Sequence, residues 1–119
     1  YNLVGNMKET RLGEFEEVLL LIVGILEKEA YAFKISEEFE EQTGRAVSIG
    51  AVHSTLDRLS KKGFLKSEMG ESTAKRGGRR KRIYSITAAG HSALADAKEL
   101  RMSLWSQYPA FSSGNLNFI

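Results

Sequence analysis

The side chains with the most obvious chemistry in this sequence are cations, and they are gathered in one segment. Residues 58–82 contain ten lysines and arginines but two glutamates, whereas the whole chain of 119 residues has a formal net charge of only +2. Such a concentration of positive charge is typical of surfaces that bind phosphate groups. It is also typical of a solvated loop. The secondary structure predicted on either side of the segment distinguishes these two interpretations.

A helix is predicted directly before the basic loop, with Ser48 as its N-terminal cap. Residues at helical spacing would turn one face of this helix to a core: Val52, Thr55, Leu56 and Leu59. The residues on the outward side and its flanks are small, polar or basic: Gly50, His53, Ser54, Arg58 and Lys61. Residues 64–69 and 83–87 are predicted to be strands on either side of the loop. A helix followed by a basic hairpin favours nucleic acid as the partner.

His53, Ser54 and Asp57 have the side-chain types of a catalytic triad. Adjacent residues of a helix point about 100° apart, and no oxyanion site is evident, so we predict that the protein is not an enzyme. The glycines of the basic loop lack the spacing of a nucleotide-binding phosphate loop. The chain has no cysteine and only two histidines, which are far apart, so neither a metal site nor another cofactor is predicted.

A second helix is predicted before this one, over residues 31–43, with Gly44 as a left-handed cap. Its outer side carries four carboxylates: Glu37, Glu38, Glu40 and Glu41. Since no histidine or converging ligand accompanies them, we interpret them as a solvated acidic face and not as a metal site. Phosphates would repel this face. The predicted helix-turn-helix unit therefore covers residues 33–62, with its acidic face directed away from DNA.

Two further helices are predicted to join two copies of the chain. The first begins at Gly13 and is apolar on more than one side, which is wider than the core of one small domain requires. The last begins at Thr87, ends before Pro109 and extends beyond the part of the chain that could cover it. The residues expected at the interface of the homodimer are Phe15, Leu19, Ile22, Ala93, Ala97, Leu100 and Leu104.

The sequence predicts neither a membrane protein nor a secreted one. The longest apolar run, residues 18–26, is far shorter than the roughly 20 residues needed to cross a bilayer. The first six residues lack the basic end and apolar stretch of a signal peptide. Together with the absence of cysteine, these features predict a cytoplasmic protein.

Two stretches of the sequence carry a resemblance to a known family. GAVHSTLDRLSKKGFLKSEMGE and GGRRKRIYSITAAGHSAL resemble the PadR-like family of bacterial winged-helix transcriptional regulators. The strongest matches lie at residues 56–63, 79–84 and 87–90, and the similarity extends from Gly13 to Trp105. One departure is His53, which stands where the family usually carries a tyrosine.

The pattern and the resemblance together imply a mainly α fold with a small β-hairpin, that is, a winged helix-turn-helix with a C-terminal dimerisation helix. We accordingly divide the chain into four parts. These are a flexible N-terminal segment (1–12), a winged-helix DNA-binding domain (13–87), a dimerisation helix (88–108) and a tail (109–119).

The resemblance further implies a sequence-specific transcriptional regulator, a repressor that binds an inverted repeat of double-stranded DNA as a dimer. The third helix would enter the major groove while the wing follows the phosphates. The residues expected to contact DNA are Ser48, Gly50, Ala51, His53, Ser54, Arg58, Lys61, Lys75, Arg76, Arg79, Arg80, Lys81 and Arg82. Two other hypotheses stay open: a protein-interaction module whose basic wing binds an acidic partner, and a small-molecule sensor.

A candidate effector site follows from the resemblance as well. In some short PadR-like proteins the last helix brings aromatic side chains together across the dimer axis, where they sandwich flat drug-like molecules. The corresponding site for a small aromatic effector would lie around Trp105, with Leu94, Arg101 and Tyr108 at compatible helical spacings. The alternative is that Trp105 only packs in the dimer interface, as large aromatic residues often do.

Overall fold

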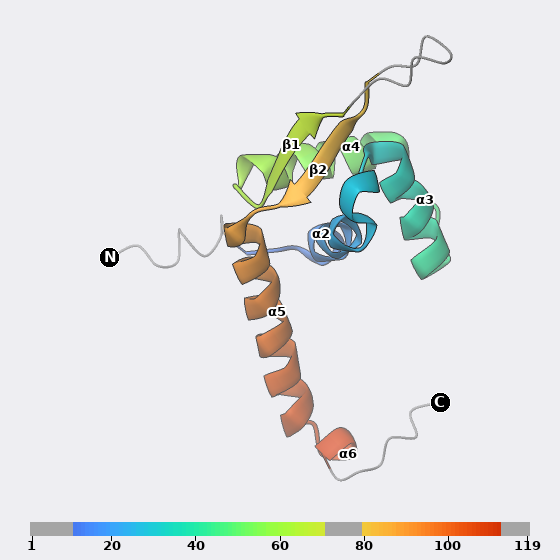
Figure 1. The fold of residues 1–119 in the computed structure, drawn as a ribbon. Coiled ribbons are helices and arrows are strands. Elements are labelled where there is room, and N and C mark those ends of the chain that lie inside the picture. Colours follow the sequence, from blue (N-terminus) through green and yellow to red (C-terminus); the bar gives the residue numbers. More distant parts are fainter. Residues whose placement is uncertain (1–10, 71–79, 113–119) are drawn as a thin grey trace.

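The computed structural model describes residues 11–70 and 80–112, which form a body of three helices with a hairpin and one projecting helix (Figure 1). The body consists of α2 (Glu14–Leu26), α3 (Ala32–Thr43) and α4 (Ile49–Lys61), with the 3-10 helix η1 (Glu27–Glu29) after α2. The antiparallel hairpin pairs β1 (Leu65–Met69) with β2 (Arg82–Ile86). From there α5 (Ala88–Gln107) leads away from the body to the one-turn helix α6 (Pro109–Ser112). This order confirms the predicted mainly α fold with a small hairpin.

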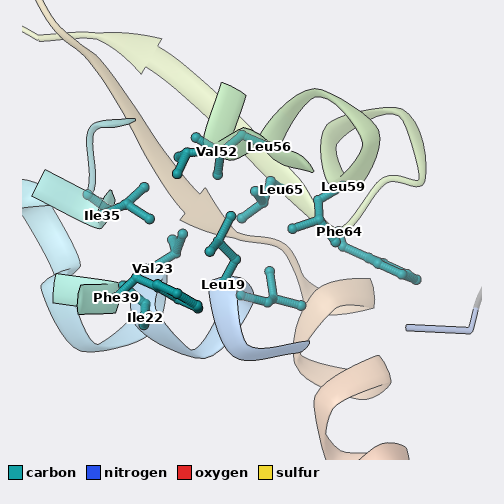
Figure 2. Close-up of a cluster of buried hydrophobic side chains, with 12 residues drawn as sticks. Leu19, Ile22, Val23, Ile35, Phe39, Val52, Leu56, Leu59, Phe64 and Leu65 are labelled. Carbon is teal, nitrogen blue, oxygen red and sulfur yellow. The ribbon is translucent and has the colours of Figure 1, made fainter. Parts of the chain in front are cut away.

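The hydrophobic core lies where the three helices meet the base of the hairpin (Figure 2). Its largest fully buried side chains come from all three helices: Leu19, Leu20, Val23, Ile35, Val52, Leu56 and Leu59. Phe64 and Leu65 close the core from the side of the hairpin. The whole predicted inner face of α4 is buried here, so helical spacing in the sequence predicted the orientation of α4 correctly.

Three predicted helix ends are confirmed. The hydroxyl of Ser48 accepts a hydrogen bond from the Ala51 N–H at 3.1 Å, and that of Thr87 accepts one from the Gly90 N–H at 3.0 Å. Gly44 follows α3 with a φ of 74°, in the left-handed region that glycine adopts without strain. The Ser48 cap makes Ile49 the first residue of α4.

Backbone contacts fix the hairpin to the body. The Tyr84 N–H donates to the carbonyl of Ala30, between η1 and α3, at 2.9 Å, and the Thr87 N–H donates to the Phe64 carbonyl at 3.0 Å across the base of the hairpin. A side chain at Gly90 would collide with this same Phe64 carbonyl, so glycine is needed for α5 to begin against the hairpin. The hairpin therefore keeps a defined position relative to the core that also orients α4.

One expectation about the dimer interface needs correction. Leu19 and Ile22, predicted at the dimer interface, are 0% and 2% exposed in the chain's own core, so they have no surface left for a partner. The exposed large apolar side chains of α2 are instead Leu21 and Ile25. The first four residues of the predicted tail (109–119) form the helical turn α6, which leaves the predicted division of the chain untested. Within the described part of the chain, no helix is both long and apolar enough to span a bilayer.

Candidate nucleic-acid interface

The first half of α4 presents an open outward face. Gly50, His53 and Ser54 are exposed there. The Ser54 hydroxyl donates to the Ala51 carbonyl at 3.3 Å, a bond that the rotatable hydroxyl can exchange for one with a partner. Ser48 uses its oxygen as the helix cap, and Ala51 is half-buried. His53 and Ser54 therefore offer the most accessible polar groups on this half of the helix.

The second half of α4 is occupied by ion pairs. Lys61 Nζ lies 3.1 Å from Asp57 Oδ2, one turn earlier, and both side chains remain largely exposed. Arg58 Nε donates to Glu16 Oε2 on α2 at 2.9 Å. Because a carboxylate already holds its guanidinium, Arg58 has less charge to offer a phosphate than the sequence prediction assumed. The Arg58 guanidinium mainly links α4 to α2.

Glu16 is the residue of α2 that makes both ion pairs linking α2 to α4 and to the residue just after it. Its side chain is 7% exposed, and both carboxylate oxygens lie 2.9 Å from Nζ of Lys62, just after α4. Burial by itself raises the pKa of the Glu16 carboxyl. Hydrogen bonds from Gly13, Lys62 and Arg58, together with the charge of Lys62, outweigh burial and bring this pKa below its usual value. The ionised carboxylate thus holds the C-terminal end of α4 against the body.

Three predicted wing cations lie at the start of β2 and just before it. Arg80 Nε donates to a backbone carbonyl across the hairpin at 3.0 Å, and Arg82 Nη1 donates to a serine hydroxyl of β1 at 3.0 Å. Lys81 Nζ lies 4.0 Å from the centroid of the Tyr31 ring, directly before α3. All three cations are exposed. Each has several N–H donors, so these contacts leave others for a phosphate.

The predicted contacts therefore divide into four groups. Those on α4 or at its N-cap that keep some exposed surface are Ser48, Gly50, Ala51, His53, Ser54 and Lys61, and those at the hairpin are Arg80, Lys81 and Arg82. Arg58 is half-exposed but held by Glu16. Lys75, Arg76 and Arg79 lie outside the described residues.

Sequence reasoning missed the residues that position this surface: Glu16, Lys62 and Tyr31. The partners of Glu16 on and after α4 are 42 and 46 positions away, and no helical spacing relates such distant residues. One local signal exists, because Glu16 stands three positions after Gly13 and accepts its N–H at 2.7 Å. That signal indicates a helix start but gives no sign of the two cations. Among the described residues, no group of three or more potential metal ligands comes together.

A second candidate surface lies on α5, where it leads away from the body. Its exposed large apolar side chains are Leu100, Met102, Leu104 and Trp105, whereas Ala93 and Ala97 are half-buried. Arg101 Nη2 lies 2.6 Å from Glu17 Oε1 and ties α5 to α2. Two of the predicted interface residues, Leu100 and Leu104, thus remain accessible to a partner.

Two open hollows adjoin this part of α5. The larger has a volume of about 400 Å³ and includes Leu21, Leu94 and Met102 in its wall. The smaller has about 290 Å³ and includes Leu104 and Tyr108. Arg101 and Trp105 line both hollows, so the four predicted effector residues all border this surface.

The comparisons with known proteins agree with this geometry. The sequence matches the model of the transcriptional regulator PadR-like family over residues 19–96. A PadR-like transcription factor from Bacteroides fragilis is 28% identical, with a TM-score of 0.64 over 87% of this chain and 92% of that one. A PadR family regulator from Clostridium difficile is 26% identical, with a TM-score of 0.58 over 79% and 97% of the two chains.

A more distant structure shares the fold alone. PadR from Bacillus subtilis, solved in complex with operator DNA, is 22% identical, with a TM-score of 0.56 over 70% of this chain and 45% of that one. No curated protein matched the sequence. Together these similarities confirm the predicted winged-helix fold.

Proposed function

Because this chain belongs to the PadR-like family of transcriptional regulators, we propose that it represses transcription by binding a specific sequence of double-stranded DNA. Members of this family are regulators and not enzymes, which agrees with the expectation from the sequence. One observation carries the proposal. The first half of α4 turns an accessible face outward, and exposed cations stand on the hairpin that packs against the same core.

In the proposed complex, the two elements have different tasks. α4 enters the major groove, where His53 and Ser54 meet the edges of the bases. Arg80 and Lys81 follow the phosphates, which carry no sequence information of their own. Helix contacts therefore specify the site, and wing contacts mainly add affinity. Operator DNA is also the partner in the B. subtilis PadR complex, whose fold this chain shares.

We propose that the regulator acts as a homodimer on an inverted repeat whose half-sites lie about one helical turn apart. Leu100 and Leu104 support this, since they are 61% and 58% exposed on a helix that leads away from the body. A second copy would cover them and the exposed Leu21 and Ile25 of α2. Light scattering at micromolar concentration should show a dimer for the parent and a monomer for Leu100→Asp. A monomeric parent would contradict this part of the proposal.

We also propose that a small aromatic effector binds beside Trp105 and releases the regulator from DNA. This proposal rests on the hollows beside Trp105, of which the larger falls in the range of about 300–1,000 Å³ that is usual for ligand sites. Planar aromatic cations and phenolic acids should quench the Trp105 fluorescence saturably and release DNA. Calorimetry of Trp105→Phe should then show no binding. If the parent does not respond to these compounds while Trp105→Phe loses dimerisation, Trp105 has only a packing role.

The main experiment compares the affinity of the full chain for a duplex from its own promoter with that for a scrambled duplex at equal salt. We expect the promoter to bind at least a thousandfold more tightly, as specific sites typically do. Equal affinities would contradict a sequence-specific regulator. Weak binding to both duplexes, with tight binding to an acidic protein, would favour a protein-interaction module. We further propose that the protein acts in the cytoplasm.

A further inference from the structure

Ile49, the first residue of α4, is an apolar side chain that the fold leaves 45% exposed. Other residues secure this end of the helix. Ser48 caps it, Val47 packs against the core, and Val52 is completely buried. Ile49 precedes the exposed His53 by four residues and so lies on the same side of α4. The apolar surface of Ile49 is therefore placed where the proposed DNA contacts begin.

The next residue, Gly50, weakens the helix, because glycine is a poorer helix former than alanine. Among the described residues, five other glycines have an internal reason. Two have a positive φ, namely Gly44 and Gly63, and at three a Cβ would crowd a neighbour closer than 3.4 Å: Gly24, Gly70 and Gly90. At Gly50 the φ is not positive, and a Cβ would meet no atom within 4 Å. The space beside Gly50 is thus open to a partner from outside the chain.

The chemistry of the major groove suggests what meets this part of α4. Base edges there present hydrogen-bond donors and acceptors, and one apolar group, the 5-methyl group of thymine. Cytosine has a hydrogen atom at the corresponding position. A branched aliphatic side chain at the front of the helix suits that methyl group, and a neighbouring glycine permits close approach of the DNA.

We infer that Ile49 reads the 5-methyl group of a thymine in each half-site, and that Gly50 provides the clearance for this contact. The inference rests on the proposed function, since it assumes that α4 enters the major groove. It adds a specificity-determining residue and a base: the operator carries thymine where the first turn of α4 meets it.

The test begins with the full chain and a pool of random duplexes, from which the tightest-binding duplex is selected. Each thymine of that duplex is then replaced by deoxyuridine, which removes the methyl group and nothing else. At one thymine per half-site, we expect the parent to lose affinity about fourfold, as one buried methyl group implies. The other thymines are internal controls and should change the affinity less than twofold.

The variant Ile49→Ala identifies the residue that reads the methyl group. It should bind the thymine duplex at least about fourfold more weakly for each half-site. Replacement of the critical thymine by deoxyuridine should then have no further effect on this variant. If Ile49→Ala remains as sensitive to deoxyuridine as the parent, another residue reads the methyl group and the inference is wrong.

The variant Gly50→Ala separates stability from binding. Alanine should raise the Tm by about 2–4 °C, because it favours the helix and has room for its methyl group. The same variant should lose at least tenfold in affinity for the selected duplex. Ser92→Ala, at an exposed position of α5, is the control and should leave DNA affinity unchanged. Unchanged affinity in Gly50→Ala would overturn the role of Gly50.

The outcomes also separate this inference from the proposed function. If the parent selects no sequence from the pool, the sequence-specific regulator fails and the inference fails with it. If the parent selects a sequence, but no thymine responds to deoxyuridine, the regulator stands and the role of Ile49 alone is wrong.

Discussion

The two halves of α4 share one buried face but differ in what their outward residues contact. In the first half, a side chain at Gly50 would meet no atom within 4 Å, and His53 and Ser54 are exposed. In the second half, Arg58 pairs with Glu16, and the following Lys62 does the same. The difference shows that one end of the helix is anchored to the body while the other remains available to a partner. A rigid anchor at one end lets the open end approach DNA in a fixed orientation.

The largest effect should come from removal of the Glu16 carboxylate, which anchors α4 by pairing with Arg58 and Lys62. Glu16→Gln keeps the size of the side chain but leaves the partly buried Lys62 without a negative partner, so we expect a loss of about 3 kcal/mol in the free energy of unfolding. Urea denaturation measures this loss. Glu14→Gln, in the same turn but exposed, is the matched control and should change stability by less than about 0.5 kcal/mol. Equal stabilities of Glu16→Gln and the parent would show that the anchor contributes nothing.

The next effect concerns the open half and should appear in binding alone. Ser54→Ala should weaken binding to the specific duplex by about 1–3 kcal/mol where a base contact is lost, and His53→Ala should act similarly. Non-specific binding and the free energy of unfolding should change little, because both side chains are exposed. Fluorescence anisotropy with specific and random duplexes measures the difference. Equal losses on both duplexes would reassign these residues to phosphate contacts.

A smaller effect on the free energy of unfolding should appear when the Glu16 carboxylate is protonated. The pKa of Glu16 is lowered in the folded protein, so the carboxylate stabilises the fold fully above its unfolded pKa of about 4.3. This contribution is lost as the pH falls through the lower folded value. The stability gap between the parent and Glu16→Gln should therefore be constant near neutrality and narrow on acidification. A gap that does not narrow in acid would rule out a contribution from the ionised carboxylate.

The smallest effect is expected for replacement of Arg58, measured as the salt dependence of DNA binding. Lys81→Gln should flatten the dependence of log K on log salt by about 0.9 for each phosphate contact that is lost. Arg58→Gln removes the same charge but should leave this slope nearly unchanged, because Arg58 is paired with Glu16. Equal changes of slope in the two variants would restore Arg58 to the DNA contacts.

The sequence was sufficient where structure depends on local spacing. The buried face of α4 follows from helical periodicity, and the caps at Ser48, Gly44 and Thr87 follow from the preferences of single residues. The motifs of the third helix and the wing also indicated the family that the comparisons confirm.

The sequence was insufficient where contacts join distant elements. The broad apolar surface of α2 indicated burial on several sides but could not show that the chain itself covers Leu19 and Ile22, leaving Leu21 and Ile25 exposed. Likewise, a glutamate in the first turn of a helix is typical of a favourable dipole interaction. That pattern does not distinguish Glu14, which is exposed, from Glu16, which binds one cation on α4 and one just after it. Such choices depend on packing in three dimensions.

Amide NMR of the full chain, with and without its selected duplex, tests the division of α4 most directly. The account predicts that DNA shifts the amide signals of residues 49–54 strongly, whereas the signals of residues 58–62 stay near their free positions. A scrambled duplex at equal salt should leave residues 49–54 much less affected. Shifts that are largest at residues 58–62, or absent from 49–54 while specific DNA is bound, would contradict the claim that the first half of α4 reads the sequence.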